Sequence, residues 1–322
     1  MGTHKSKVVV RSTQQKPLYQ TVENLMEALN WKSIILPEAK VVIKLNLNTA
    51  ERDIIESADT SPALVEALCK VLQTRTNAIT LVEAHGYRYP AEEAFRAAGI
   101  YELADRLGIQ VVNLSNQPCQ EVGNLLLGPL PRILLEADAF ITMPVIKTHA
   151  LTYFTGSLKN QWGCVPRYDR IALHHSLDQL LVDLQSILRP KLCIMDGIVG
   201  VEGRGPTNGK PRRLDIILGS TDAVALDATA MRLVGLVPTK ARHVVLAYEA
   251  GLGTFHEDEI DLDSDRVPDW APYEPAKLDW AVAWMNHWTK HGWFRRFILE
   301  VDPIFQGGKW IVNVLRKIGI VR

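Results

Sequence analysis

The chain has 322 residues, of which 47% are hydrophobic and 22% charged, and its formal net charge is zero. This length accommodates one large α/β domain or two lobes around one site. Because its charges balance, the chain lacks the global basic field that is typical of nucleic-acid-binding proteins. No run of eighteen apolar residues occurs, so no segment is predicted to cross a membrane as a helix.

From the N-terminus, short apolar runs alternate with segments whose apolar residues recur at helical spacing. In the first half, strands are predicted over 7–11, 40–45, 78–83, 110–114 and 137–143, and helices over 21–31, 62–71, 92–98 and 101–107. A predicted helix over 175–188 precedes strands over 191–195 and 213–218 and helices over 223–233 and 240–250. This order is typical of a Rossmann-like α/β fold, with a mostly parallel sheet and helices on both faces.

The acidic stretch 257–265 marks the predicted end of this α/β core, which we place at residues 1–265, with one or two lobes around one crevice. The extension over 266–322 contains six of the eight tryptophans and is predicted to be helical. Between 281 and 322, seven basic and two acidic residues give a net charge of +5. Trp280, Trp284 and Trp288 stand four residues apart, so they form one stripe on a helix.

This aromatic stripe has three interpretations. It packs on the core or on a second subunit of an oligomer, or it forms a lid over the site. Alternatively, residues 280–322 make a peripheral membrane contact, because tryptophan lies at the lipid interface and basic groups attract anionic lipid.

The four cysteines, Cys69, Cys119, Cys164 and Cys193, contain no C-x-x-C pair. This spacing argues against an iron–sulfur cluster and against a four-cysteine zinc site. Scattered cysteines suit a reducing compartment, and we expect a cytoplasmic protein.

Polar side chains follow almost every predicted strand. One or two polar residues lie at or just after the end of each of five predicted strands. They are Lys44 and Asn46, Glu83, Lys147 and His149, Asp196, and the pair Ser220 and Asp222. In open α/β sheets, ligands bind outside the carboxyl ends of parallel strands. We therefore expect one crevice lined by these residues, with the alternative that strand ends are simply where polar loops begin.

The segment from Lys147 to His175 concentrates cationic and imidazole side chains. Lysine and arginine suit phosphate or carboxylate recognition, and histidine acts as acid, base or metal ligand near neutral pH. A structural or surface role is the alternative for any one residue. We predict catalytic roles for Lys147, His149, Lys159 and His174, and ligand contacts for Lys44, Asn46, Asn160 and Arg167.

A glycine-rich connection is predicted over 196–210. Gly203 and Gly205 permit close backbone approach, so their N–H groups and Lys210 are predicted to contact an anion. A plain connection between two strands is the alternative. The segment is not a Walker loop, because Pro211 stands where Ser or Thr should follow the lysine.

A divalent metal is the cofactor that the sequence allows, although it identifies no particular metal and contains no H-E-x-x-H motif. The candidate ligands are Glu83, His149, His175, Asp196 and Glu202. His174 and His175 are neighbours and point in different directions on a helix, so at most one of them faces a shared site.

These motifs, in this order, resemble the family called domain of unknown function 362, over residues 40 to 255. The matching pieces are Lys44-Leu45-Asn46-Leu47, Thr60-Ser61-Pro62, Pro144 through His149, Ser157-Leu158-Lys159-Asn160 with Gly163, His174 or His175, Asp196-Gly197, Glu202-Gly203 with Gly205-Pro206 and Gly209, and Ser220 with Asp222 and Asp227. The resemblance implies no established activity. Many members carry ferredoxin-like clusters, whose cysteines this sequence lacks. A distant similarity to lactate-racemase-type folds is an analogy of fold without matched residues.

Together, these features predict an enzyme of undetermined reaction. It binds an anionic small molecule bearing phosphate or carboxylate at the strand ends, with or without a divalent metal. The alternative is a non-catalytic carrier of a metal or cofactor that attaches to a membrane surface through its C-terminal extension. No nucleic-acid partner is expected.

Overall fold

The computed structural model describes residues 5–86, 88–124, 126–167 and 170–278, and residues 283, 287, 288 and 291. The chain divides into two compact units. The first comprises Met1–Pro166 and Asp178–Lys277, and the second comprises Arg167–Leu177 and Leu278–Arg322. Trp280 and Trp284 of the predicted aromatic stripe lie outside the described residues.

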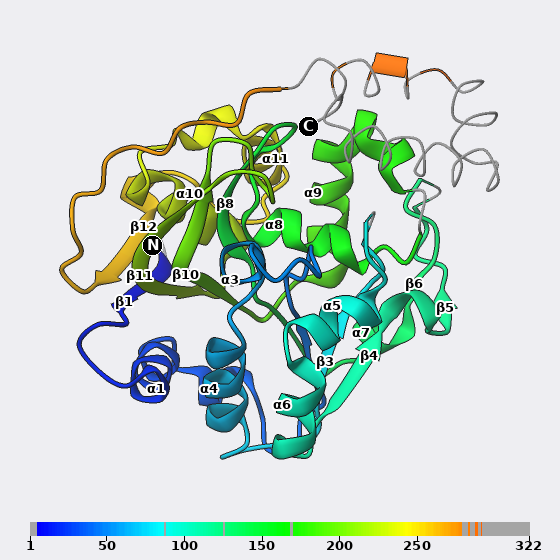
Figure 1. The fold of residues 1–322 in the computed structure, drawn as a ribbon, viewed down its shortest axis with the longest axis vertical. Helices are drawn as coiled ribbons and strands as arrows, with labels where there is room; N and C mark the ends of the chain where they lie inside the picture. Colours follow the sequence, from blue (N-terminus) through cyan, green and yellow to red (C-terminus); the bar gives the residue numbers. More distant parts are fainter. Residues whose placement is uncertain are drawn as a thin grey trace. The chain divides into compact units, whose positions relative to one another are not determined.

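The first unit is built on a sheet of short parallel strands joined to a long antiparallel hairpin (Figure 1). The strands are β1 (Ser6–Ser12), β2 (Val41–Lys44), β3 (Ile79–Glu83), β4 (Gln110–Asn113), β7 (Ala139–Thr142), β8 (Val145–His149), β9 (Tyr153–Phe154), β10 (Leu192–Glu202), β11 (Lys210–Ser220) and β12 (Ile260–Ser264). A separate two-stranded sheet pairs β5 (Cys119–Gln120) with β6 (Leu130–Pro131).

The strand order is β12-β1-β11-β10-β7-β2-β3-β4. The pairs that join β10, β7, β2, β3 and β4 are all parallel, whereas β11 runs antiparallel to both β10 and β1. The predicted α/β fold with a mostly parallel sheet is therefore confirmed. Because the parallel strands share one direction, the ends of β2, β3 and β7 lie at one edge of the sheet.

Helices cover both faces of the sheet. They are α1 (Leu18–Ala28), α2 (Trp31–Ile34), α3 (Ile55–Ala58), α4 (Pro62–Leu72), α5 (Ala91–Ala97), α6 (Ile100–Leu107), α7 (Arg132–Leu135), α8 (Gly156–Asn160), α9 (Leu177–Leu188), α10 (Ala223–Leu233) and α11 (Arg242–Glu249).

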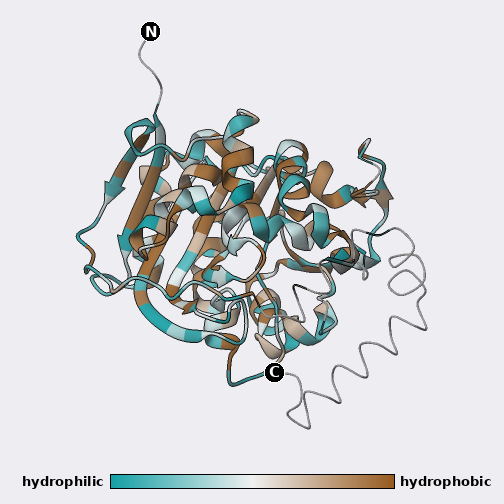
Figure 2. Cartoon of the chain, turned by 90° about the horizontal axis from the view of Figure 1, so that it is seen from above, coloured by the Kyte–Doolittle hydropathy of each residue, from teal (hydrophilic) through white to brown (hydrophobic). Residues whose placement is uncertain are grey.

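Two hydrophobic clusters form the core. One contains buried residues of α1, α4, α5 and α6, and the other contains buried residues of α8, α10 and α11. Alternate residues of β1 belong to different clusters, since Val9 lies in the first and Val8 and Val10 lie in the second. This alternation is expected for a strand covered on both faces. The strands of the sheet are accordingly largely brown in the hydropathy view (Figure 2).

The strand that the sequence predicts over 137–143 is β7, and a second strand, β8, follows it where the sequence predicts a loop. Pro144 lies between β7 and β8, and its carbonyl oxygen accepts a hydrogen bond from Asp196 N at 2.8 Å. β7 pairs with the start of β10, and β8 pairs with the later part of the same strand. Lys147 consequently lies inside a strand rather than in the predicted loop. The break matters because it turns the chain toward the edge that carries the polar residues.

The predicted glycine-rich loop is shorter than expected. Residues 196–202 continue β10, and β11 begins at Lys210, so only 203–209 connect the two strands. Asp196 therefore lies within a strand. Ser220, the last residue of the antiparallel strand β11, pairs with Cys193, which in turn pairs with Thr142 at the end of β7, and its hydroxyl donates to the carbonyl oxygen of Lys7 on β1. Asp222 caps α10 by accepting hydrogen bonds from Val224 N and Ala225 N.

The acidic stretch before the extension is part of the sheet. Residues 260–264 form β12, which pairs in parallel with β1. Arg11 holds this edge strand, because its guanidinium donates to both carboxylate oxygens of Asp263 at 2.9 and 2.8 Å. The acidic residues are thus the exposed positions of an edge strand, where charge discourages pairing with other chains.

Candidate functional site

A buried ion pair joins the ends of two neighbouring strands. Lys44 is the last residue of β2 and Glu83 the last residue of β3, and their side chains are only 1% and 6% exposed. Lys44 Nζ lies 2.6 Å from Glu83 Oε1 and also donates to the carbonyl oxygen of Leu45. Glu83 accepts further hydrogen bonds from the backbone N–H groups of Leu47 and Ala84. Both charges are therefore compensated inside the protein.

Gly163 is required by the close approach of this ion pair. A Cβ atom at this position would lie 2.6 Å from Lys44 Nζ and 2.7 Å from Glu83 Oε1. These distances are shorter than any real carbon contact, so a larger residue would displace the pair. The glycine of the S-L-K-N-x-x-G segment is thus explained by packing against the ion pair.

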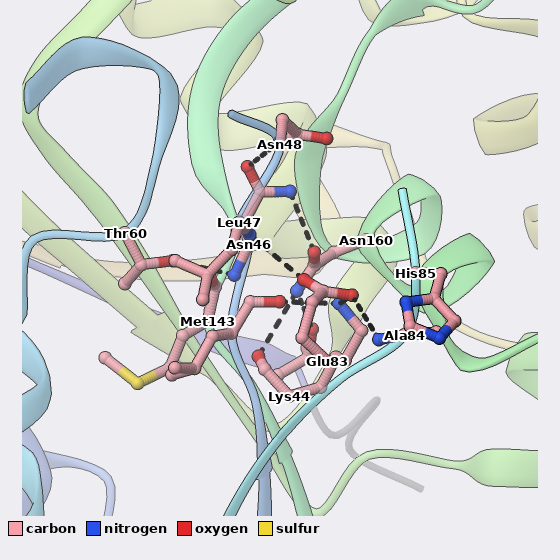
Figure 3. A network of polar contacts seen from close by, with 12 residues as sticks. Lys44, Asn46, Leu47, Asn48, Thr60, Glu83, Ala84, His85, Met143 and Asn160 are labelled. Atoms are coloured by element: carbon pink, nitrogen blue, oxygen red, sulfur yellow. Dashed lines mark hydrogen bonds and ion pairs between the residues drawn. The ribbon is translucent and has the colours of Figure 1, made fainter. Parts of the chain in front are cut away.

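A chain of side-chain amides continues the network toward the surface (Figure 3). Asn160, at the end of α8, donates to Thr142 Oγ1 at 2.8 Å and accepts from Asn46 Nδ2 at 2.9 Å. Asn48 Nδ2 donates to Asn46 Oδ1 at 2.7 Å. Thr142 and Asn160 are buried, whereas Asn46 and Asn48 are partly exposed. The two exposed amides are the part of the network that a bound molecule can reach.

Lys147 lies beneath these amides and is completely buried. Its Nζ donates to Asn46 Oδ1 at 2.6 Å and to the carbonyl oxygen of Ala58 at 2.5 Å. Burial lowers the pKa of Lys147 to about 8, although the nearby carboxylates of Asp59, Glu83 and Asp196 oppose that shift. The ammonium group is therefore held by protein oxygens and loses its proton more readily than an exposed lysine.

Two buried aspartates complete the charged cluster. Asp59 Oδ1 accepts from Asn48 N at 2.6 Å, and Asp59 Oδ2 has no hydrogen-bond partner among the described residues. Asp196 accepts from the backbone N–H groups of Ser61 and Ile198. Burial raises the pKa of Asp59 to about 7 and that of Asp196 to about 6. Sequence reasoning missed Asp59, although it directly precedes the Thr60-Ser61-Pro62 motif.

The helix that carries Asn160 is positioned by another buried carboxylate. Asp227, on α10, accepts hydrogen bonds from Ser157 N at 2.5 Å and from Leu158 N at 3.1 Å, the first N–H groups of α8. Gly156 adopts a φ of +52° and leaves no room for a side chain beside this carboxylate. Lys159, on the same short helix, is partly buried. Asp227 thus fixes Asn160 and Lys159 in space and has a structural role.

The predicted His149 and a second histidine near the strand ends, His85, have local hydrogen bonds. His149 Nδ1, at the end of β8, accepts from Leu151 N at 3.1 Å and Thr152 N at 3.3 Å. His85 Nδ1 accepts from Ala91 N at 3.1 Å, at the start of α5. These bonds stabilise a turn and a helix start.

The hairpin tip is held by contacts of its own. Glu202 pairs with Arg212 at 3.0 Å and accepts from Glu274 N at 3.1 Å, and Gly203 N donates to the carbonyl oxygen of Glu274 at 2.8 Å. A side chain at Gly205 would collide with the backbone of Thr148. Lys210 is exposed at the start of β11. The structure therefore does not bring Glu202, Gly203 and Lys210 into the hydrogen-bonded network around Lys44 and Lys147.

Three predicted residues, Arg167, His174 and His175, belong to the second unit. His174 and His175 lie on the 3-10 helix Arg170–Ser176, where His175 Nδ1 is 3.0 Å from the carbonyl oxygen of Ala172. In the part of the chain that the structure describes, no three His, Cys, Asp or Glu side chains are placed to hold a metal ion together. The predicted metal ligands thus do not converge within the described residues.

The cluster combines two lysines with three carboxyl groups at the carboxyl edge of the parallel strands. Lys147 and Asp59 have pKa values displaced from opposite sides toward neutrality, to about 8 and about 7. Such a pair can release and accept a proton near neutral pH. The partly exposed Asn46 and Asn48 link it to the surface by hydrogen bonds.

Comparisons with known proteins agree with this architecture. The family model described as Domain of unknown function (DUF362) matches residues 41–232. A curated relative, the thylakoid-associated protein sll1697 of Synechocystis sp., is 26% identical over 316 residues, which cover 90% of this chain and 94% of the relative. No helix within the described ranges is long and apolar enough to span a membrane.

A solved structure shares the fold. The lactate racemase apoprotein from Thermoanaerobacterium thermosaccharolyticum superposes with a TM-score of 0.50 at 12% sequence identity. The match covers 74% of this chain and 59% of the racemase chain, so less than two thirds of that protein is represented here. At this identity, the similarity establishes the α/β fold and no residue roles.

We expect the substitution Lys44→Met to lower the free energy of unfolding by about 3–5 kcal/mol, because it leaves the buried Glu83 carboxylate without its counter-ion. The matched control is Lys70→Met, since Lys70 pairs with Glu66 at 2.7 Å on the exposed side of α4. That substitution should cost only about 0.5 kcal/mol. Urea denaturation of both variants measures the difference, and equal losses would contradict the proposed importance of the buried pair.

The raised pKa of Asp59 predicts a specific pH dependence. The folded state favours the protonated carboxyl of Asp59, so this group stabilises the fold fully below its unfolded pKa of about 4. That stabilisation is lost as pH rises toward its folded pKa of about 7. Relative to Asp59→Asn, which does not titrate, the wild-type protein should lose stability between those values. Lys147 remains protonated over that range.

Chemical denaturation of wild type and Asp59→Asn at half-unit steps of pH provides this measurement. Asp138→Asn is the control, because Asp138 is exposed and accepts one backbone hydrogen bond from Lys40 N. A stability difference between wild type and Asp59→Asn that stays constant across the range would show that Asp59 titrates normally.

Proposed function

We propose that this chain, which belongs to the family described as Domain of unknown function (DUF362), is an enzyme that binds a small anionic molecule at the carboxyl edge of its parallel strands. One observation carries the proposal. Five charged side chains, all almost completely buried, lie at the edge where open α/β sheets bind ligands. They are Lys44, Lys147, Asp59, Glu83 and Asp196.

Burying this many charges is costly, and stability alone does not require it. An apolar core of the same volume is often as stable as a buried ion pair. Strongly displaced pKa values are concentrated at functional sites, where acid and base groups must work near neutral pH. Lys147 and Asp59 fit that pattern, which favours an acid–base role over a purely structural one.

Asp59 Oδ2 is buried and has no hydrogen-bond partner among the described residues, which favours a polar contact with a bound molecule. Buried polar atoms in folded proteins almost always have a hydrogen-bond partner, supplied by the protein, by water or by a ligand. We assign this partner to the bound molecule. Asn46 and Asn48 would orient it through their amides, and the positive charges of Lys147 and Lys159 would compensate its anionic group.

The comparisons are consistent with a small anionic ligand. The solved structure of the same fold is named a lactate racemase, an enzyme named for a small hydroxycarboxylate. In this proposal, His149, at the end of β8, acts as an acid or a base. A divalent metal is an optional component, because Glu83 and Glu202 already receive protein hydrogen bonds.

Native mass spectrometry with elemental analysis, on the full chain purified without a chelator or a metal-affinity tag, tests this proposal first. We expect a bound anion at unit stoichiometry, and the elemental analysis reports any accompanying metal. Added inorganic phosphate, pyrophosphate and citrate should include at least one compound that raises the melting temperature. Occupancy at 100 times Kd stabilises a protein by about 2.7 kcal/mol.

The variant Asn48→Ala should abolish this stabilisation, because it removes an exposed amide of the network. Asn77→Ala is its matched control, since Asn77 is exposed on the turn before β3 and away from the network. A clean apo mass together with no rise in melting temperature for any of the three anions would overturn the proposal. Binding without turnover of the identified ligand would instead favour a carrier.

A second candidate, a peripheral membrane contact through 280–322, is favoured by the relative whose name describes it as thylakoid-associated. The basic, tryptophan-rich composition of this extension suits anionic lipid surfaces. The full chain should float with vesicles of anionic lipid at low salt and dissociate as salt rises. Vesicles of neutral phosphatidylcholine are the control, and a chain that stays unbound at low salt rejects this candidate.

A further inference from the structure

A second pair of titratable side chains lies away from the network described above. His243, on α11, is completely buried, and neither of its ring nitrogens has a hydrogen-bond partner in the described part of the chain. Asp178, near the start of α9, presents a buried Oδ1 atom that likewise lacks a hydrogen-bond partner there. His243 Nδ1 and Asp178 Oδ1 are 3.6 Å apart. Three unpartnered polar atoms therefore belong to one side-chain pair.

Such a pair is energetically unfavourable as it stands. Each buried polar atom without a partner costs about 1–3 kcal/mol, so native proteins rarely retain several together. A small approach of the two side chains closes an N–H···O bond between Nδ1 and Oδ1. This bond fixes the proton on Nδ1 and leaves Nε2 as a hydrogen-bond acceptor inside the protein.

Charged groups on two neighbouring helices act on the ring. Burial lowers the pKa of His243, the carboxylate of Asp178 on α9 opposes this effect, and the ammonium of Lys159 on α8 adds to it. The imidazole is therefore neutral near pH 7, which is the form that accepts a proton. The positive charge of Lys159 also disfavours a metal cation beside the ring.

The exposure of the two side chains differs. The Asp178 side chain is 30% exposed, whereas that of His243 is 0% exposed. Asp178 thus connects the buried ring to solvent. Lys159 is the neighbour of Asn160, which belongs to the network at the strand ends. The pair lies beside the helix that carries both predicted site residues.

We propose that Asp178 orients His243 as a proton-accepting imidazole, with Nδ1–H donated to the carboxylate and Nε2 directed into the protein interior beside Lys159. Carboxylate-oriented imidazoles of this kind are typical of proton-transferring sites. The inference shares Lys159 with the anion proposal, but it does not depend on anion binding, because its test reads the tautomer of His243 directly.

Long-range proton–nitrogen NMR correlation on the full, uniformly ¹⁵N-labelled chain tests the inference directly. The chain has nine histidines, so the signals of His243 are identified by their absence in His243→Gln. At pH 7.5, we expect the less common tautomer, with Nδ1 protonated and Nε2 showing the chemical shift of an unprotonated nitrogen. In Lys159→Met, the same tautomer should persist and the ring should protonate at higher pH.

Asp178→Ala removes the acceptor and should return the ring to a mixture of tautomers or to the Nε2–H form. Asp183→Ala is the matched control, because Asp183 lies on the same helix but its carboxylate accepts a hydrogen bond from Asn124 Nδ2 and does not pair with His243. An Nε2–H tautomer in the wild-type protein would overturn the inference without any variant. Unchanged signals in Asp178→Ala, or equal changes in Asp183→Ala, would also overturn it.

Discussion

The burial of charge at the end of β2 constrains everything around it. Lys44 is an ammonium inside the core, and it is tolerable only because Glu83 approaches it to 2.6 Å. That approach fixes the ends of β2 and β3 relative to each other and requires glycine at position 163. It also holds the backbone of Leu47 against the Glu83 carboxylate. The loop that presents the amides of Asn46 and Asn48 is therefore positioned by an ion pair.

Buried carboxylates position the neighbouring elements as well. Asp227 receives the first N–H groups of α8, Asp196 receives Ser61 N just before α4, and Asp59 receives Asn48 N. Each bond ties a segment distant in sequence to the site edge. Because burial raises the pKa values of all three groups, their protonation and the geometry of this edge are linked. The scaffold and the proposed chemistry thus use the same side chains.

The two proposed proton-exchanging pairs are linked through two adjacent residues at the end of the short helix α8. Asn160 connects α8 to the network of Asn46 and Lys147, and Lys159 contributes its charge to the environment of His243. A neutral imidazole and an acid–base pair near neutrality suit a reaction that moves protons more readily than one that needs a strong nucleophile.

The sequence by itself determined the fold class and the edge of the sheet that carries the polar residues. Apolar runs such as 40–45 identify buried parallel strands, and Lys44, Asn46 and Glu83 at their ends do meet in one network. Tertiary structure decided what local pattern cannot encode. Ser220 bonds to the carbonyl oxygen of Lys7 and Asp222 caps α10, and Glu202, a predicted metal ligand, is bonded to Arg212 and to Glu274 N. Asp59 and His243 became visible only through burial, because an isolated Asp or His carries no periodic signal, whereas its desolvation depends on packing by residues far away in the chain.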